Sequence, residues 1–169
     1  MQEQKLHYLQ TKWTYWFDNG KSTEKSNSNE IKAKQVYTFG TAEEFWGLYE
    51  GLGKITNSIK GSDSFVFREN YLPKTYENGG RLTFTIPIGS TEEQSDFVED
   101  VWLKLMLFCI GETIIHRENI FGISFSLRST ARLYIYLNSL DETIINEISS
   151  FIKDYFKIKD NIKFFPHKN

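Results

Sequence analysis

The chain is poor in cysteine, proline and histidine, and it has no long hydrophobic run. Its 169 residues include one Cys, three Pro and three His. A single thiol excludes an internal disulfide, and Cys109 lies in an apolar helical run, where a buried free thiol is the expected role. Lys104 interrupts the longest apolar stretch, so nothing approaches the roughly 20 residues that cross a bilayer. We therefore expect no membrane span and a reducing, cytoplasmic setting.

An excess of charge is also missing. The 20 Lys and Arg residues are balanced by 22 Asp and Glu residues, for a net charge of −2. This balance argues against a protein that coats nucleic acid through overall positive charge, so any RNA recognition must be local. The three His residues show no metal-ligand spacing with the Cys, and no Gly-rich phosphate loop follows a strand. We expect no enzyme, no metal and no other cofactor.

Aromatic residues, in contrast, are abundant at 16% of the chain, and 40% of the chain is hydrophobic. This length and composition are typical of one domain with one core, so we expect a single, monomeric domain over residues 1–169. Aromatic side chains serve either a packed core or a surface that stacks on flat ligands. Residues 18–34 contain no aromatic residue, and their polar composition predicts a long loop.

Alternating hydrophobicity predicts several strands. They are residues 13–17, 36–39, 81–88, 123–127 and 133–137, with a last short strand within 163–169. The short link from Arg128 to Arg132 predicts that two of them form an antiparallel hairpin. Strands and helices alternate irregularly, which favours an α+β fold with an antiparallel sheet covered on one face.

Capping patterns predict the helices. Thr41 and Glu44 form a Thr-x-x-Glu box before a helix that ends near Gly51 and Gly53. A second helix is expected over residues 95–110, closed by Gly111, and Ser139-x-x-Glu142 predicts the start of a third.

The second helix has more apolar residues than one core face can use. Leu103, Leu107 and Ile110 are spaced i, i+4, i+7 and form a stripe of their own beside the core stripe. An exposed apolar stripe of this kind on a soluble monomer requires a covering partner.

The four tryptophans form a pattern with two short motifs. Trp13, Trp16, Trp46 and Trp102, with His7-Tyr8-Leu9 and Gly79-Gly80-Arg81, resemble in order the landmarks of the eukaryotic translation initiation factor 4E family. The resemblance runs from about His7 to Ile158. Members of that family bind the 5′ cap of messenger RNA. The resemblance implies a curved, mainly antiparallel sheet with three helices on its convex face and the ligand on the concave side.

Cap recognition sets a defined physical problem. The positively charged, flat 7-methylguanine ring needs aromatic faces, a carboxylate for its N1 and N2 hydrogens, and cations for the triphosphate. The resemblance assigns these roles in order to Tyr76, Glu77, and the pair Arg128 and Arg132, and it places Tyr136 beside the cap methyl group. The hairpin is expected to bring the two guanidinium groups together. A polar loop around Tyr76 and a solvated turn at the arginines remain the alternatives.

Two further observations bear on this site. Strand alternation independently puts Arg132, Tyr134 and Tyr136 on one face, and His167 and Lys168 are further candidates for phosphate contacts. The family's first stacking aromatic, however, would fall near Ser28 and Asn29, where no ring occurs.

The loss of one ring face costs about 1 to 3 kcal/mol, or roughly ten- to a hundredfold in affinity. We therefore expect weakened or altered cap binding, unless Tyr37 or Phe17 substitutes or the ligand is a variant cap.

A second surface is implied by the same resemblance. His7, Leu9, Trp46, Leu103 and Leu107 match positions that bind a helical peptide from a scaffold subunit or a repressor. An amphipathic helix laid across the apolar stripe is the helix-in-groove mode; simple burial of these side chains is the alternative. Two functions follow: a cap-binding initiation factor that recruits a scaffold, and a cap-silent relative that acts as a protein-binding adaptor or decoy.

Overall fold

A computed structural model of the protein describes residues 3–21 and 32–167. The elements are the strands β1 (Tyr8–Asp18), β2 (Lys34–Thr41), β3 (Asp63–Arg68), β4 (Gly80–Pro87), β5 (Ile120–Leu127), β6 (Thr130–Leu137) and β7 (Lys163–Pro166), the helices α1 (Ala42–Leu52), α2 (Glu92–Ile110) and α3 (Glu142–Phe156), and the 3-10 turns η1 (Ile55–Asn57) and η2 (Arg117–Asn119). The strands form one seven-stranded sheet in the order β2-β1-β3-β5-β6-β4-β7. Every neighbouring pair is antiparallel, as the sequence predicts.

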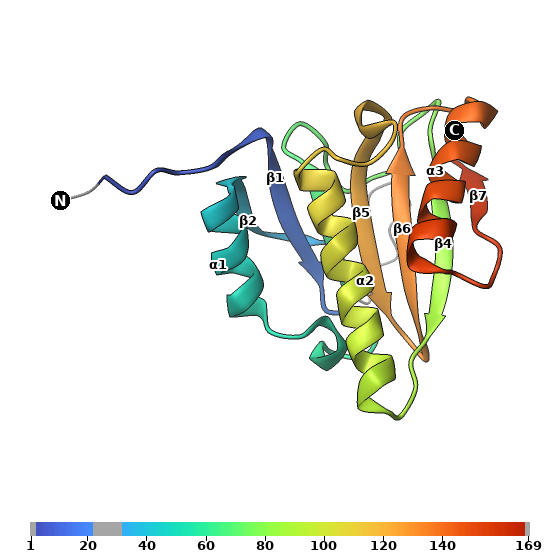
Figure 1. Cartoon of the computed structure of the whole chain (residues 1–169), viewed down its shortest axis with the longest axis horizontal. Helices are drawn as coiled ribbons and strands as arrows, with labels where there is room; N and C mark the ends of the chain where they lie inside the picture. The colour runs from blue at the N-terminus through green and yellow to red at the C-terminus, as the bar shows by residue number, and fades with distance from the viewer. Residues whose placement is uncertain (1–2, 22–31, 168–169) are drawn as a thin grey trace.

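All three α-helices lie on the same face of the curved, open sheet (Figure 1). Strand alternation directs apolar side chains toward them: in β4, Leu82, Phe84 and Ile86 are buried, whereas Thr83 and Thr85 between them are partly exposed. The opposite face of the sheet, called here the uncovered face, carries no helix formed by residues 3–21 or 32–167. The predicted architecture is thereby confirmed.

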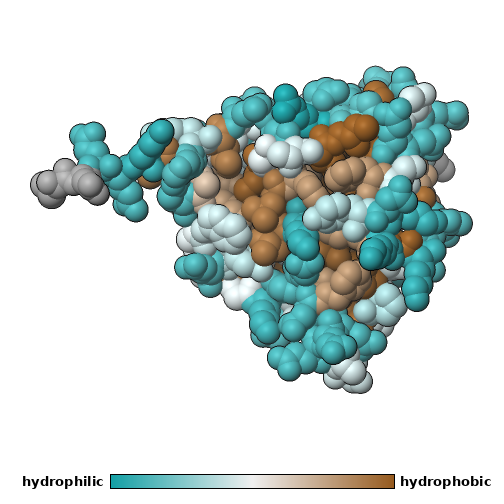
Figure 2. Space-filling view, viewed as in Figure 1, coloured by the Kyte–Doolittle hydropathy of each residue, from teal (hydrophilic) through white to brown (hydrophobic). Residues whose placement is uncertain are grey.

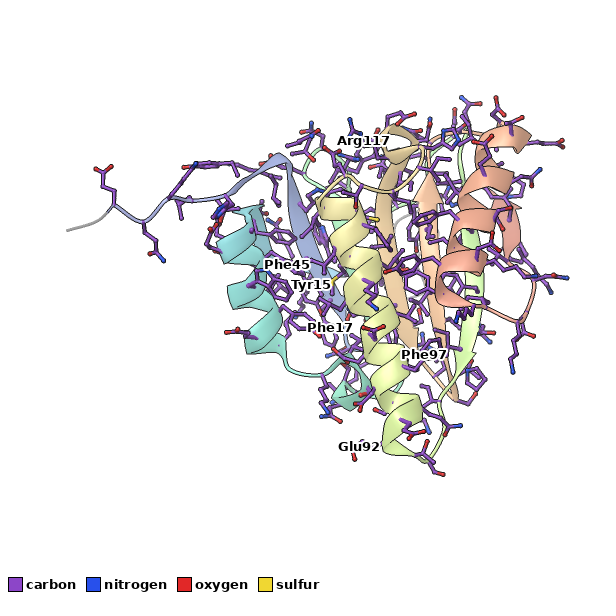
Figure 3. All side chains as sticks on the ribbon, viewed as in Figure 1. Tyr15, Phe17, Phe45, Glu92, Phe97 and Arg117 are labelled. Atoms are coloured by element: carbon purple, nitrogen blue, oxygen red, sulfur yellow. The ribbon has the colours of Figure 1, made fainter. Side chains whose placement is uncertain are left out.

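The core fills the space between the sheet and the helices. Trp13 and Tyr15 of β1 meet Phe45 of α1 and Trp102 of α2 there, all at most 5% exposed. Figure 3 shows Tyr15 and Phe45 between α1 and the sheet. Burial of one large apolar side chain contributes about 1.5 to 3 kcal/mol, so this layer dominates the stability of the fold.

The predicted role of Cys109 as a buried free thiol is confirmed. It is 2% exposed within the core, and burial raises its pKa to about 12. Because the thiolate is the nucleophile, such a thiol is chemically inert.

The cap of α1 is as predicted, and that of α2 lies further upstream. Thr41 Oγ1 accepts the Glu44 N–H at 3.1 Å, and Gly53, at φ 72°, ends α1 in the left-handed region that favours glycine. α2 begins at Glu92 because Thr91 and Gln94 form a reciprocal capping box that satisfies the first amides of the helix.

The predicted capping box at Ser139 is wrong. Asp141, not Ser139, caps α3, because its carboxylate accepts the Thr143 and Ile144 N–H groups at 2.8 and 3.4 Å. The Ser139 hydroxyl instead accepts the Asp141 N–H at 3.1 Å and so orients the cap.

One member of the predicted second stripe of α2 is also corrected. Leu103 and Leu107 are half-buried, but Ile110 is only 4% exposed and belongs to the core. Ile110, in the last turn of α2, and Ile114 of the segment that follows belong to the same core cluster.

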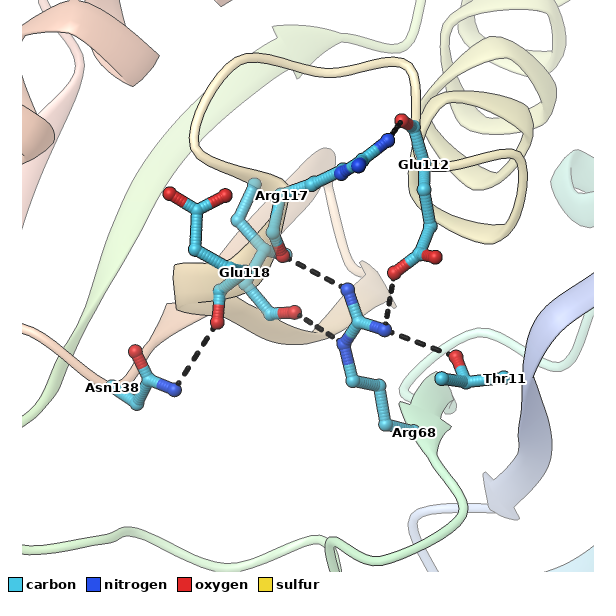
Figure 4. A network of polar contacts seen from close by, with 7 residues as sticks. Thr11, Arg68, Glu112, Arg117, Glu118 and Asn138 are labelled. Atoms are coloured by element: carbon cyan, nitrogen blue, oxygen red, sulfur yellow. Dashed lines mark hydrogen bonds and ion pairs between the residues drawn. The ribbon is translucent and has the colours of Figure 1, made fainter.

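A polar network joins elements that are distant in sequence (Figure 4). Arg68 of β3 pairs with Glu112, which follows α2, at 2.6 Å. Arg68 also donates to Thr11 Oγ1 of β1 at 3.0 Å and to the Arg117 carbonyl of η2 at 2.9 Å, and its guanidinium lies 4.7 Å from the Trp13 ring centre. Both charged side chains are largely buried, so each depends on the other for compensation.

None of the helices that residues 3–21 and 32–167 form has both the length and the apolar character that a membrane crossing requires. Within the same residues, no group of three or more His, Cys, Asp and Glu side chains is placed to hold a metal ion.

Candidate functional site

The uncovered face carries the polar and aromatic side chains of β6 and β4. The pairing of these strands sets Arg132 opposite Thr85, Tyr134 opposite Thr83, and Tyr136 opposite Arg81. Cross-strand partners point to the same face of a sheet, and the intervening residues of β6 are buried in the core. The predicted placement of Arg132, Tyr134 and Tyr136 on one face is confirmed.

An aromatic cluster forms the centre of this face. Its buried members are Phe65, Phe67, Phe121 and Tyr136, and half-buried Trp16, Tyr71, Tyr76 and Tyr134 pack around them. The Phe67 ring lies 5.9 Å from Phe121 and 5.0 Å from Tyr136. Gly122 makes this packing possible, because a Cβ there would lie 2.0 Å from Cδ1 of Phe67. The cluster is therefore a rigid aromatic floor.

Tyr76 stands at the edge of this floor. Its hydroxyl accepts the Leu72 N–H at 2.8 Å and donates to the Leu72 carbonyl at 3.2 Å. The ring meets Phe121 edge-on at 5.1 Å, and the Lys74 ammonium lies 5.0 Å from the ring centre. Burial raises the pKa of the Tyr76 hydroxyl, so the ring stays neutral at physiological pH. Its backbone N–H also donates to His167 Nδ1 at 3.4 Å.

Glu77, next in the chain, is exposed. Asn78 follows it at φ 61°, and the chain then enters the Gly79-Gly80 pair. A Cβ on Gly79 would lie 2.3 Å from the Leu137 carbonyl oxygen, so only glycine allows this close approach to β6. The turn thereby holds Tyr76 and Glu77 beside the aromatic cluster.

The expected meeting of Arg128 and Arg132 is not what their contacts show. Arg128 turns toward β3, where it pairs with Asp63 at 3.1 Å and donates to the Ser62 carbonyl at 3.1 Å. Arg132 is exposed on the other side of the hairpin and lines a hollow with residues of β4 and β7. An acidic side chain on the neighbouring strand, invisible to local spacing, accounts for the difference.

Tyr136 and His167 are less accessible than expected. Tyr136 is 2% exposed, its hydroxyl lies 3.1 Å from Ser124 Oγ, and burial raises its pKa to about 12. It belongs to the floor of the face. His167 is partly buried with its ring 6.3 Å from that of Tyr136, and burial lowers its pKa, so it is uncharged at neutral pH. His167 therefore acts as a hydrogen-bond acceptor rather than a cation for phosphate.

The rings considered as substitutes for the missing aromatic do not reach this face. Phe17 packs on the core, and Tyr37 pairs across β1 and β2 with the core residue Tyr15. Trp16 lies on the uncovered face instead, paired with Phe65 and half-buried beside the cluster. Strand alternation could have predicted the position of Trp16. Its neighbours Tyr15 and Phe17 face the core, so Trp16 must face the opposite side of the sheet. Ser28, Asn29 and Lys168 lie outside the described residues.

A second candidate surface lies on the helix-covered side. Trp46 of α1 is 41% exposed, and Leu103 and Leu107 of α2 and Leu9 of β1 are half-buried. Together these four residues are called the helix-face patch. Figure 2 shows apolar surface gathered between α1 and α2. The exposure of Trp46 argues against the alternative that it serves only the core.

His7 ties the N-terminal segment to the start of α1. Its Nδ1 lies 2.6 Å from a Glu43 carboxylate oxygen, its N–H donates to the same carboxylate at 3.0 Å, and its carbonyl accepts the Ala42 N–H at 2.8 Å. The hydrogen bonds from His7 lower the pKa of Glu43 to about 2. His7 thus positions the strand that carries Leu9.

An open antiparallel sheet with helices on one face and an aromatic, basic surface on the other defines a class of α+β binding proteins. Residues 8–169 match the family described as eukaryotic initiation factor 4E. Eukaryotic translation initiation factor 4E-1 of Glycine max is 30% identical over 169 residues, covering 96% of this chain and 68% of that protein.

Two solved structures are also similar. Ascaris suum eIF4E-3, in complex with the m7G cap, shares a TM-score of 0.83 and 25% identity, with 98% of this chain and 93% of that chain covered. Schistosome eIF4E, complexed with m7GpppA and 4E-BP, shares a TM-score of 0.78 and 26% identity over 96% of this chain and 89% of that chain. The chain belongs to the eukaryotic initiation factor 4E family.

Proposed function

We propose that this protein is a cytoplasmic translation initiation factor that binds the 5′ cap of messenger RNA on its uncovered face. The observation that carries the proposal is the rigid aromatic floor, with Tyr76 and Glu77 held at its edge and arginines nearby. Relatives solved with the m7G cap and with m7GpppA support it.

Each proposed contact has a physical role. Tyr76 offers a ring for the cationic base, a contact worth about 0.5 to 2 kcal/mol, and Glu77 accepts hydrogen bonds from the guanine N1 and N2 groups. Trp16 is our candidate for the second ring. Arg132 is free to meet a phosphate, whereas Arg128 must share its guanidinium with Asp63. We therefore expect weaker cap binding than a site with two unpaired arginines gives.

The test is calorimetric titration of the purified protein, at fixed salt, with 7-methyl-GTP, GTP and a 2′-O-methylated cap dinucleotide. Selective binding of a methylated ligand is expected. Tyr76→Ala should reduce it about tenfold or more, because the ring contact and stacking are lost. Tyr37→Ala removes an exposed ring from the other side of the sheet and serves as the matched control.

The same protein is proposed to recruit a scaffold or repressor through the helix-face patch. The exposed Trp46 and the half-buried Leu103 and Leu107 suit the apolar side of an amphipathic helix. The schistosome relative solved with 4E-BP supports this assignment.

A cap-silent adaptor is the second candidate function. It is favoured by the burial of Tyr136 and by the absence of any aromatic residue from 18 to 34. If the folded protein binds none of the three nucleotides, the adaptor replaces the cap-binding factor, and the helix-face patch becomes its functional surface.

A further inference from the structure

The turn that carries Tyr76 and Glu77 is held at both ends by one residue, His167. The Tyr76 N–H donates to His167 Nδ1 at 3.4 Å, and the His167 N–H donates to the Gly79 carbonyl at 2.9 Å. Glu77 lies between these two anchored residues in the chain. His167 therefore closes the turn of residues 76–79, although it lies far from this turn in the sequence.

The last strand brings His167 to this place. Gly80 pairs with Pro166, so His167 follows directly after the last paired residue of β7. The His167 ring is partly buried, and its centre lies 6.3 Å from that of Tyr136 in the aromatic floor. The ring thus contacts the turn while it lies beside the floor.

Only one neutral form of the His167 ring suits these contacts. Nδ1 accepts a hydrogen bond, so the proton of the neutral ring must lie on Nε2. Nε2 is buried and has no hydrogen-bond partner among the described residues. Neither ring nitrogen thus contacts a carboxylate of residues 3–21 or 32–167 that would stabilise a charged ring.

Protonation of the ring reverses the role of Nδ1. A charged imidazole carries a hydrogen on both nitrogens, so Nδ1 would face the Tyr76 N–H as a second donor. The hydrogen bond that holds Tyr76 exists only with the neutral ring. At 3.4 Å it is also long, so its loss releases the turn without disturbing the rest of the fold.

The surroundings favour the neutral ring at physiological pH. Burial lowers the pKa of His167, and the positive charge of Arg81 lowers it further. The titratable and charged side chains of the elements around the ring are Arg81 of β4, Tyr136 of β6, and Lys74, Tyr76 and Glu77 of the segment that forms the turn. Burial raises the pKa values of both tyrosines, so neither titrates near neutrality.

We propose that His167 is a positioning residue of the cap site: its neutral ring and its backbone N–H hold the turn of residues 76–79, and protonation of the ring releases the Tyr76 end. Tyr76 and Glu77 then meet the methylated base less well, so cap affinity falls in mild acid. The pKa of His167 lies below the ordinary value of 6.5, so the turn is held above this range and released as the pH falls through it. This inference rests on the proposed function, which makes Tyr76 and Glu77 the base contacts.

The experiment titrates the whole protein with 7-methyl-GTP at fixed salt over the range in which a His titrates, about pH 5 to 8. The terminal phosphate of the ligand also titrates near about pH 6, so each wild-type affinity is divided by that of His167→Asn at the same pH. Asn offers an oxygen acceptor close to the position of Nδ1 and does not titrate. This ratio is expected to fall about two- to tenfold with the pH, as the loss of one hydrogen bond implies.

His167→Ala separates the hydrogen bond from the charge. It should bind 7-methyl-GTP about two- to tenfold more weakly than wild type at the upper end of the pH range, whereas His167→Asn retains the affinity there. The matched control is His116→Asn, because His116 pairs with Glu147 of α3 and Asn tolerates its left-handed backbone at φ 56°. The control should keep the wild-type pH profile. A ratio of wild-type to His167→Asn affinity that stays constant with pH would overturn the inference.

Failure of cap binding itself is distinguished by a measurement without ligand. The amide signal of Tyr76 is followed by NMR in the free protein over the same pH range. If 7-methyl-GTP binds at no pH, this signal decides. A titration that appears in wild type and His116→Asn but not in His167→Asn supports the positioning role, and identical behaviour of all three proteins overturns it.

Discussion

Single neighbours determine what the side chains of the uncovered face can do. Asp63 holds Arg128 toward β3, so a phosphate must compete with a carboxylate for that guanidinium. The half-exposed pair gives only modest stability, and exchange of one anion for another is energetically accessible. Arg132 forms no ion pair with any of residues 3–21 and 32–167 and is therefore the stronger phosphate candidate.

At the same scale, Trp46 allows a sharp test of the helix-face patch. Trp46→Ala should weaken binding of an amphipathic helical peptide by tenfold or more, because large aromatic anchors dominate such interfaces. The fold should persist, since the side chain is 41% exposed. Peptide titration and thermal unfolding measure the two effects.

Leu140→Ala is the matched control, because Leu140 is an exposed apolar residue outside the patch. Unfolding of the Trp46→Ala protein, rather than selective loss of peptide binding, would restore a purely structural role for this tryptophan.

At the scale of elements, the Gly79-Gly80 pair sets the position of β7. Gly80 pairs with Pro166, and a Cβ there would lie 2.3 Å from the Phe164 ring and 2.6 Å from the Phe165 carbonyl oxygen. Glycine thus lets β7 lie against β4 while Phe164 reaches the core. The short last strand in turn supplies Lys163 and Phe165 to the hollow that Arg132 lines.

Gly80→Ala should therefore destabilise the protein by about 1 to 3 kcal/mol through overpacking. Urea unfolding measures the change. Gly47→Ala is the control, because a Cβ at this position in α1 meets no atom within 4 Å. That substitution should stabilise the helix by about 0.5 to 1 kcal/mol. Equal stability of the two variants would show that β7 shifts freely to admit the methyl group.

At the scale of the whole molecule, the Arg68 network ties the first strand to the middle of the chain. It links β1 and β3 to the segment between α2 and β5, and the aromatic cluster lies across the same strands. The site therefore depends on a contact that lies outside it.

Arg68→Met should lower the free energy of unfolding by about 3 kcal/mol or more, because it leaves the Glu112 carboxylate buried and unpaired. The double variant Arg68→Met/Glu112→Gln should recover part of this loss. Lys104→Met breaks the exposed pair with Asp100, 2.9 Å apart, and should have little effect. Denaturant titration compares all three; a small loss in Arg68→Met would mean that water reaches the carboxylate.

Particular residues show how far sequence reasoning reached. The Thr41 cap of α1 and the alternation of β4 and β6 followed from local pattern, and the family resemblance located Tyr76 and Trp46. Two side chains have other partners than predicted. Asp141, which lies inside the Ser139-x-x-Glu142 motif, caps α3 in place of Ser139. Arg128 pairs with Asp63, which is distant in the chain and which local spacing does not reveal.

The sequence by itself determined the local periodicity of this protein. It indicates which residues alternate between the two faces of a strand, where helices begin, and which aromatic rings share a face. These depend on neighbours a few positions apart. Apart from the hairpin of β5 and β6, only the tertiary structure decided which strands are adjacent. β4 lies between β6 and β7, which follow it at long distance in the chain, and this order assembles Arg81, Arg132 and Lys163 around one hollow. Spacing along the chain does not contain that information, because sheet order is set by packing of the whole core.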